Sequence, residues 1–168
     1  MKFFDLFGKK DPENSEVASL LHEETDPDEV VFGIYDRILE KSAYGDCPNQ
    51  LTPEERAILV VRLVEDEVNN GGFSQFIFNS SGHFAGETVA AMTAIGAHVT
   101  AAICQRAWDA FGTDIPVNRG ARQALLESKE DEGIDEILDE CDHAFYAYED
   151  DLVQLCYAYI MAHKQAFR

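Results

Sequence analysis

The chain has 168 residues, of which 46% are hydrophobic, so it can bury a core in one domain without disulfide or metal support. Its 32 acidic residues outnumber its 13 lysines and arginines, giving a formal net charge of −19. A field of this sign repels nucleic acid and anionic membranes and attracts basic surfaces, so we expect no direct binding to nucleic acid or membrane. Solubility and adaptation to salt are alternative explanations of the charge.

The first 25 residues are predicted to form an N-terminal acidic segment that is partly ordered, with a short helix around Val17, Leu20 and Leu21. No small-residue cleavage site follows the apolar residues of the opening decapeptide, and no stretch approaches the roughly 18 consecutive apolar residues of a membrane span. The four cysteines form no Cys-x-x-Cys pair, which indicates reduced, mostly buried thiols. These features predict a cytoplasmic protein.

A helical domain is predicted over residues 26–168. Asp26 and Pro27 have the residue types of a capped helix start. Thr52 and Glu55 form a clearer capping box around Pro53, and the helix that follows has so wide an apolar surface that we expect it at the centre of the fold.

The sequence NNGGFSQFIFNSSG, residues 69–82, interrupts that helix pattern. Gly71 is expected to end the helix in the left-handed conformation, with Gly72 as a second permissive residue. Gln75 and Asn79 are then expected to bond backbone groups freed at this corner, which we interpret as structural. Its motif residues are Asn70, Gly71, Gly72, Phe73, Gln75, Phe76, Asn79, Ser80 and Gly82. An enzyme pocket formed by Glu67, Asn70, Gln75, Asn79 and His83 is the alternative, but the spacing identifies neither an activated nucleophile nor an acid–base pair.

Further helices are predicted after the corner. The first presents a small-residue packing face of Ala90, Ala91, Ala94 and Ala97, and the next has Val99, Ile103, Ala107 and Ala110 in register. Asn118 is expected to cap a shorter helix, and the last helix starts near Asp150 and Asp151. With no strand alternation and no repeat, the predicted fold class is all-α, a single compact domain of about seven to nine helices.

Twelve acids and one base, Lys129, lie between Glu127 and Asp151, with enough apolar residues among them to pack the segment down. If this segment is helical, carboxylates one turn apart repeat at about 5 to 6 Å, a spacing close to that of phosphates along one DNA strand. The same arrangement also describes an ordinary solvated helix face. No His-x-x-x-His pair occurs, and the Glu-x-x-His within D-E-C-D-H, residues 139–143, has no second cluster to complete a site, so we assign no metal, cofactor or catalytic residue.

The pattern N-x-G-G-F-x-Q-F-x-x-N-S-S-G at residues 69–82, followed by A-x-x-A-I-G-A at residues 91–97, resembles the bacterial DNA-mimic family, the Neisseria-type acidic DNA mimics and their relatives. The resemblance covers roughly residues 50–165. It implies an all-helical, dimeric, acidic protein that occupies the DNA-binding face of a helix-turn-helix transcription factor and relieves its hold on DNA.

The hypothesis is therefore a non-enzymatic DNA mimic that binds a regulator with a basic surface and competes with DNA. A general protein-interaction module without mimicry is the alternative from another class, beside the enzyme pocket. The negative side chains of two regions are expected to converge into one band. The partner-binding residues are expected to be Glu130, Asp131, Glu132, Asp135, Glu136, Asp139, Glu140 and Asp142, supported by Glu23, Glu24, Asp26, Asp28 and Glu29.

Overall fold

A computed structural model describes residues 17–22 and 25–167. Within these ranges every regular element is a helix and no strand occurs, so the predicted all-α class is confirmed. After a short helix at residues 17–20 come α2 (Pro27–Lys41), α3 (Pro53–Phe78), α4 (Thr88–Ile95), α5 (His98–Asp109), α6 (Arg119–Lys129), α7 (Ile134–Tyr146) and α8 (Leu152–Ala162). Three 3₁₀ helices lie between them, η1 (Pro48–Gln50), η2 (Ser80–Glu87) and η3 (Glu130–Glu132), and η4 (Lys164–Phe167) follows α8.

Helix α3 is the centre of the fold, as its apolar surface predicts. The Thr52 hydroxyl accepts a hydrogen bond from the Glu55 backbone N–H at 3.1 Å, and the Glu55 carboxylate accepts one from the Thr52 N–H at 2.8 Å. This capping box satisfies two backbone donors that a helix start leaves unpaired. Beyond it, α3 packs against α2, α4, α6 and α7, which bury its apolar side chains on most sides.

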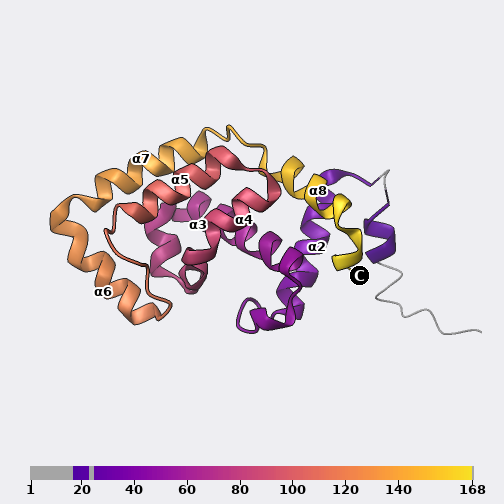
Figure 1. Ribbon diagram of the computed structural model, residues 1–168, viewed down its shortest axis with the longest axis horizontal. Coiled ribbons are helices and arrows are strands. Elements are labelled where there is room, and N and C mark those ends of the chain that lie inside the picture. Colours follow the sequence, from indigo (N-terminus) through magenta and orange to yellow (C-terminus); the bar gives the residue numbers. More distant parts are fainter. Residues whose placement is uncertain (1–16, 23–24, 168) are drawn as a thin grey trace, which may run out of the picture.

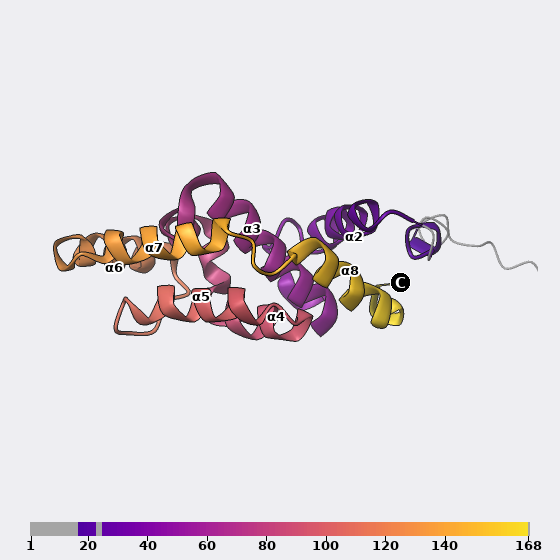
Figure 2. The ribbon, with the colours of Figure 1, turned by 90° about the horizontal axis from the view of Figure 1, so that it is seen from above.

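The molecule is elongated, with α7 along one long edge (Figure 1). The segment 147–151 continues along that edge to α8, which packs against α2 at the other end. Viewed from above, α4 and α5 form a layer beside α7 (Figure 2). Helix α5 packs against α4 and α7, so the acid-rich helix is supported from below by α3 and α5.

The glycine corner interrupts α3, which consists of two helical segments joined at a kink, so the predicted break in the helix is confirmed. The left-handed conformation predicted for Gly71 is wrong: its φ of −167° is extended backbone, and it is Gly72 that has a positive φ, 77° with ψ −179°. The physical reason is the approach of α7, because a Cβ at Gly72 would lie 2.2 Å from Oδ2 of Asp142. That close approach lets Asp142 Oδ1 accept a hydrogen bond from the Phe73 N–H at 2.8 Å, and the helix then continues to Phe78.

The aromatic residues of the corner fill the core between α3, α5 and α7. Phe73 meets Trp108 and Phe145 edge to face, with ring centroids 5.5 and 5.9 Å apart. Phe76 stacks on Trp108 at 5.7 Å, and the Trp108 indole N–H donates to the Thr88 hydroxyl at 2.7 Å. Such pairs add specific geometry to a large burial of apolar surface, which supports the structural interpretation of the corner.

Two predicted packing faces are displaced from those in the structure. Val99, predicted to face the core from α5, is 39% exposed. One cause is an anchor at the helix start, where Thr100 donates from its N–H and its hydroxyl to Asp150 at 2.7 and 3.0 Å. The buried residues of α5 are Thr100, Ala101, Cys104, Ala107 and Trp108. Of the predicted small-residue face, Ala91 and Ala97 are buried, and Ala90 and Ala94 are exposed.

Candidate functional site

The acid-rich segment folds as η3 followed by α7. Gly133 separates the two with a φ of 78°, a left-handed conformation that glycine adopts without strain. Along α7 the apolar residues recur every three or four positions, which places them on one face of the helix. These buried residues are Ile134, Leu138, Cys141 and Phe145. Because they point into the core, the acids between them point outward.

Seven of the eight acids predicted on this segment are exposed: Glu130, Asp131, Glu132, Asp135, Glu136, Asp139 and Glu140. Within α7 they form two short rows at a spacing of four residues, Asp135 with Asp139 and Glu136 with Glu140. Four residues correspond to about 6 Å along a helix axis. Because α7 runs along one long edge of the molecule (Figure 1), its exposed acids repeat at one-turn intervals along that edge.

Two of these seven carboxylates have basic partners. Lys129 Nζ lies 2.7 Å from Glu132 Oε2, and Arg106 of α5 forms an ion pair with Glu140. The remaining five make no ion pair with any residue that the structure describes: Glu130, Asp131, Asp135, Glu136 and Asp139. Exposed pairs of this kind contribute little stability, so a partner's arginine or lysine can replace them at low cost.

Asp142 has a different position from the other predicted acids. Its carboxylate lies under the glycine corner, where it accepts the hydrogen bond from Phe73, and the residue is only partly exposed. Burial raises the pKa of Asp142, and the Phe73 hydrogen bond opposes this shift. These contacts make it a structural link between α7 and α3.

The acids predicted around the start of α2 lie elsewhere. Asp26 caps the helix by accepting a hydrogen bond from the Asp28 N–H at 2.9 Å, while Asp28 and Glu29 are exposed in the first turn. Glu23 and Glu24 lie outside the described residues. Figures 1 and 2 show α2 and α7 at different ends of the long axis, with the start of α8 between them. The described acids of the two regions are thus separate groups and do not form one contiguous band.

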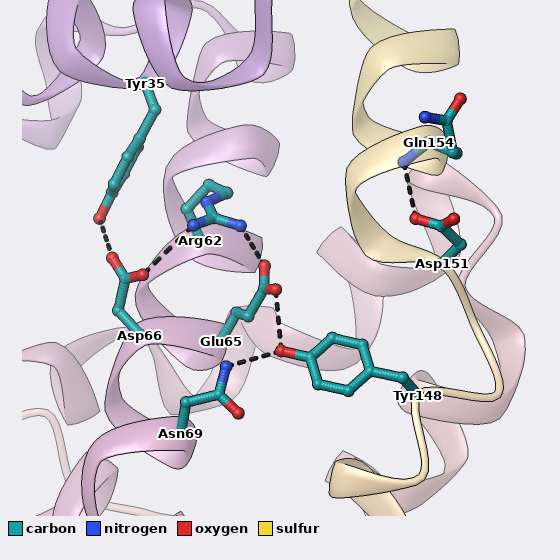
Figure 3. Close-up of polar contacts among 8 residues, drawn as sticks. All are labelled: Tyr35, Arg62, Glu65, Asp66, Asn69, Tyr148, Asp151 and Gln154. Carbon is teal, nitrogen blue, oxygen red and sulfur yellow. Dashed lines mark hydrogen bonds and ion pairs between the residues drawn. The ribbon is translucent and has the colours of Figure 1, made fainter. Parts of the chain in front are cut away.

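A buried polar network holds the end of α7 against α3 (Figure 3). Arg62 of α3 is 4% exposed and forms ion pairs with Glu65 and, at 3.3 Å, with Asp66. The Tyr148 hydroxyl, from the segment after α7, donates to Glu65 at 3.0 Å and accepts from the Asn69 amide at 2.6 Å. Removing one partner of the buried Arg62–Glu65 pair costs on the order of 3–5 kcal/mol. The Tyr148 hydrogen bond attaches the segment after α7 to this pair.

The same network reaches α2. The Tyr35 hydroxyl donates to Asp66 at 3.0 Å, and the Arg62 guanidinium carbon lies 4.8 Å from the centre of the Phe32 ring. Burial raises the pKa of Tyr35 above its ordinary value, and the charge of Asp66 adds to the shift. The sequence analysis assigned no specific role to Arg62. A usable signal was the group Arg62, Glu65 and Asp66, spaced by three and four residues on an otherwise apolar helix.

The polar residues of the corner bind one carboxylate rather than the backbone groups predicted for them. Glu67 Oε2 accepts hydrogen bonds from Gln75 Nε2 at 2.7 Å and Asn79 Nδ2 at 2.9 Å, and Oε1 accepts one from the Ser81 hydroxyl at 2.7 Å. Apart from a 3.5 Å contact of Gln75 with the Glu67 carbonyl, the expectation about freed backbone groups is wrong. The reason is that Glu67, one helical turn before the kink, offers a stronger, charged acceptor.

The alternative enzyme pocket is not assembled around one hollow. A shallow depression of about 570 Å³ is lined by Asn70 and Gln75 together with Leu63, Asp66, Glu67 and Asn69. Asn79 does not line it, and His83 lines a different hollow. Asn70 and Ser80 are exposed.

Arginines of α6 cap the end of α3, a role that sequence reasoning missed. Arg122 is 1% exposed; its Nε donates to the Ile77 carbonyl at 3.0 Å and its Nη2 to the Asn79 carbonyl at 2.7 Å. Arg119 Nε donates to the Phe78 carbonyl at 3.1 Å. A cation is favourable at a helix C-terminus, where carbonyls lack partners. Gly82 is required here, because a Cβ would lie 2.6 Å from Arg122 Nε.

The described residues contain no group of three or more His, Cys, Asp or Glu side chains that could hold a metal ion. None of the described helices combines the length and the apolar character needed to cross a bilayer.

Comparison with known proteins places the chain in a family. A family model described as DMP19-like protein matches residues 49–163. No curated protein and no solved structure matches the chain significantly. The matched region begins just before α3 and includes the glycine corner, the exposed acids of η3 and α7, and α8. The resemblance seen in residues 69–97 is confirmed, and the chain belongs to the DMP19-like (DNA mimic protein 19) family.

Proposed function

We propose that the protein is a DNA mimic whose carboxylate rows on η3 and α7 bind the DNA-binding surface of a transcription regulator, such as one of the helix-turn-helix class, and compete with DNA. Membership of a family named for a DNA mimic supports the general class. A cytoplasmic location and the homodimer implied by the resemblance are part of the same proposal.

The observation that carries the proposal is a set of five exposed acids that form no ion pair with the described part of the chain: Glu130, Asp131, Asp135, Glu136 and Asp139. A net charge of −19 alone does not favour one surface over another, whereas an ordered row presents charge along a line, as a nucleic-acid strand does. Glu132 and Glu140 extend the row when a partner's cation replaces Lys129 or Arg106.

The row stands on a rigid support. Four buried side chains, the Asp142–Phe73 hydrogen bond and the Tyr146 hydroxyl, which donates to the Val68 carbonyl at 2.8 Å, hold α7 on α3. Because the helix is already ordered, binding loses little conformational entropy in its backbone. Asp28 and Glu29, in the first turn of α2, add to the negative field of the molecule. The role of Glu23 and Glu24, outside the described residues, stays a prediction from the sequence.

A matched pair of triple variants tests the proposal. In the first, Asp135→Asn, Glu136→Gln and Asp139→Asn neutralise the centre of the row. In the control, Asp36→Asn, Glu40→Gln and Asp114→Asn remove the same charge from exposed acids elsewhere. Wild-type and variant proteins are immobilised, exposed to native lysate at low salt, and eluted in a salt gradient; recovered proteins are identified by mass.

We expect the wild type and the control to retain a DNA-binding regulator that the row variant loses. Duplex DNA should displace it, and raising ionic strength from about 0.05 to about 0.2 M should weaken the complex by on the order of tenfold or more, since screening acts on exposed charges. Equal retention by both variants would refute the assignment of the row. A partner that binds independently of salt and of DNA would instead indicate a general interaction module.

A further inference from the structure

A second feature lies on the edge opposite α7, between the η1 turn and the start of α6 (Figure 1). It is a hollow of about 450 Å³, within the size range of small-molecule sites. Its walls come from four parts of the chain: residues 44–49, the first half of α3, η2 and residues 117–122.

Three arginines line this hollow: Arg56, Arg119 and Arg122. Among its described lining residues Asp46 is the single acid. Arg56 holds Glu87 through Nε at 2.5 Å and Nη2 at 2.8 Å. In the part of the chain that the structure describes, Arg119 and Arg122 form no ion pair with a carboxylate. Two uncompensated cations in so acidic a protein make the hollow a local positive site.

Backbone contacts hold one of the lining arginines in a fixed position. Arg122 is locked by carbonyls of Ile77 and Asn79 and by those of Pro116, at 3.3 Å, and Val117. Burial lowers the pKa of Arg122, and the charge of Arg119 acts in the same direction, yet an arginine stays protonated. Arg119 uses only Nε on the Phe78 carbonyl, so its two terminal amino groups make no described hydrogen bond.

Other groups in the lining suit an amphipathic anion. The Ser80 hydroxyl and the exposed His83 ring line the same hollow as Arg119, and neither side chain has a hydrogen-bond partner among the described residues. Leu63, Phe84 and Val117 provide apolar wall. An arginine fork matches the oxygen geometry of phosphate and carboxylate groups.

We infer that this hollow is a binding site for a small anionic molecule that carries a phosphate or carboxylate on an aromatic body. Arg119 binds the anionic group, and the apolar wall takes the ring. The inference is independent of the proposed DNA mimicry, since it uses another surface and the opposite charge.

The test is a titration of the ¹⁵N-labelled full-length protein with phenyl phosphate, benzoate and inorganic phosphate, followed by amide chemical shifts. We expect saturable shifts at the amides of Ser80, His83 and Arg119 with phenyl phosphate or benzoate, and weaker binding of inorganic phosphate. Arg119→Gln should weaken binding about tenfold, the effect of losing one charge-assisted hydrogen bond. The control Arg106→Gln removes an exposed arginine of α5 that does not line the hollow, and should leave binding unchanged.

Three outcomes would overturn the inference. Linear, non-saturating shifts would show only diffuse attraction. An equal loss in the Arg119 and Arg106 variants would assign binding to net charge rather than to the hollow. Tighter binding of a hexaglutamate peptide than of phenyl phosphate at the same amides would assign the hollow to an acidic protein segment. Thermal unfolding of each variant checks that the fold is retained.

Discussion

Replacing Gly72 with alanine should destabilise the protein strongly, although it changes no charge and adds one methyl group. At φ 77° and ψ −179° the backbone occupies a region essentially restricted to glycine, where another residue costs about 1–3 kcal/mol. The new Cβ would also lie 2.2 Å from Asp142 Oδ2, so the carboxylate must move. Its hydrogen bond from the Phe73 N–H is then lost, at a cost of roughly 1–3 kcal/mol.

Together these effects predict a loss of about 2–6 kcal/mol, a large fraction of the roughly 5–15 kcal/mol that stabilises a typical protein. Urea denaturation followed by circular dichroism measures the unfolding free energy. Gly86→Ala is the matched control, because Gly86 has no atom within 4 Å of an added Cβ. It should change stability by no more than about 0.5 kcal/mol.

A double-mutant cycle separates the two causes. In an Asp142→Ala background the overlap and the hydrogen bond are already gone, so Gly72→Ala should cost only the backbone strain of about 1–3 kcal/mol. Equal costs for Gly72→Ala and Gly86→Ala would refute the reasoning. An unchanged cost in the Asp142→Ala background would refute the part assigned to α7.

Two further predictions concern titratable groups. Because burial raises the pKa of Asp142, the native state binds this proton more tightly than the unfolded chain. The unfolding free energy of the wild type should therefore fall relative to that of Asp142→Asn as pH rises from the unfolded pKa through the folded one; parallel pH profiles would contradict this. Burial also raises the pKa of Cys104 and Cys156 to about 12 and raises that of Cys141, so a thiol reagent at about pH 8 should label only the exposed Cys47 in the native state. The Cys47→Ser variant should react only after unfolding, and fast labelling of that native variant would show that the core is open.

Local signals gave the helix starts correctly. Asp26, Thr52, Asn118 and Asp151 each cap a helix, because a capping side chain needs only the N–H groups two or three residues ahead. The wide apolar surface of α3 likewise indicated its central place, since it reflects burial on most sides. The face of each helix that is buried was harder to predict from the sequence. The buried face of α5 is set partly by Asp150, fifty residues away, which periodicity within one helix cannot reveal.

The candidate site was also predicted only in part. Spacing along residues 130–140 predicted that acids would share an outer helix face, and the structure exposes them. It could not separate Asp142, which faces the Gly72 kink, from its exposed neighbours, nor distinguish Glu132 and Glu140, with their basic partners, from the unpaired acids. The cationic hollow had no sequence signature, because its arginines are distributed over α3 and the region around the start of α6.

The sequence by itself determined the helical class and the excess of negative charge, because composition, capping residues and hydrophobic periodicity act within a few residues of the chain. The family was indicated by a motif resemblance at residues 69–97 and shown by the family model. Only the tertiary structure decided which charges are exposed, paired or buried. It turned Arg62 and Arg122 into buried contacts, kept the acids of α2 apart from those of α7, and set Gly72 against Asp142. These outcomes depend on groups far apart in the chain, whose distances are fixed when the helices pack.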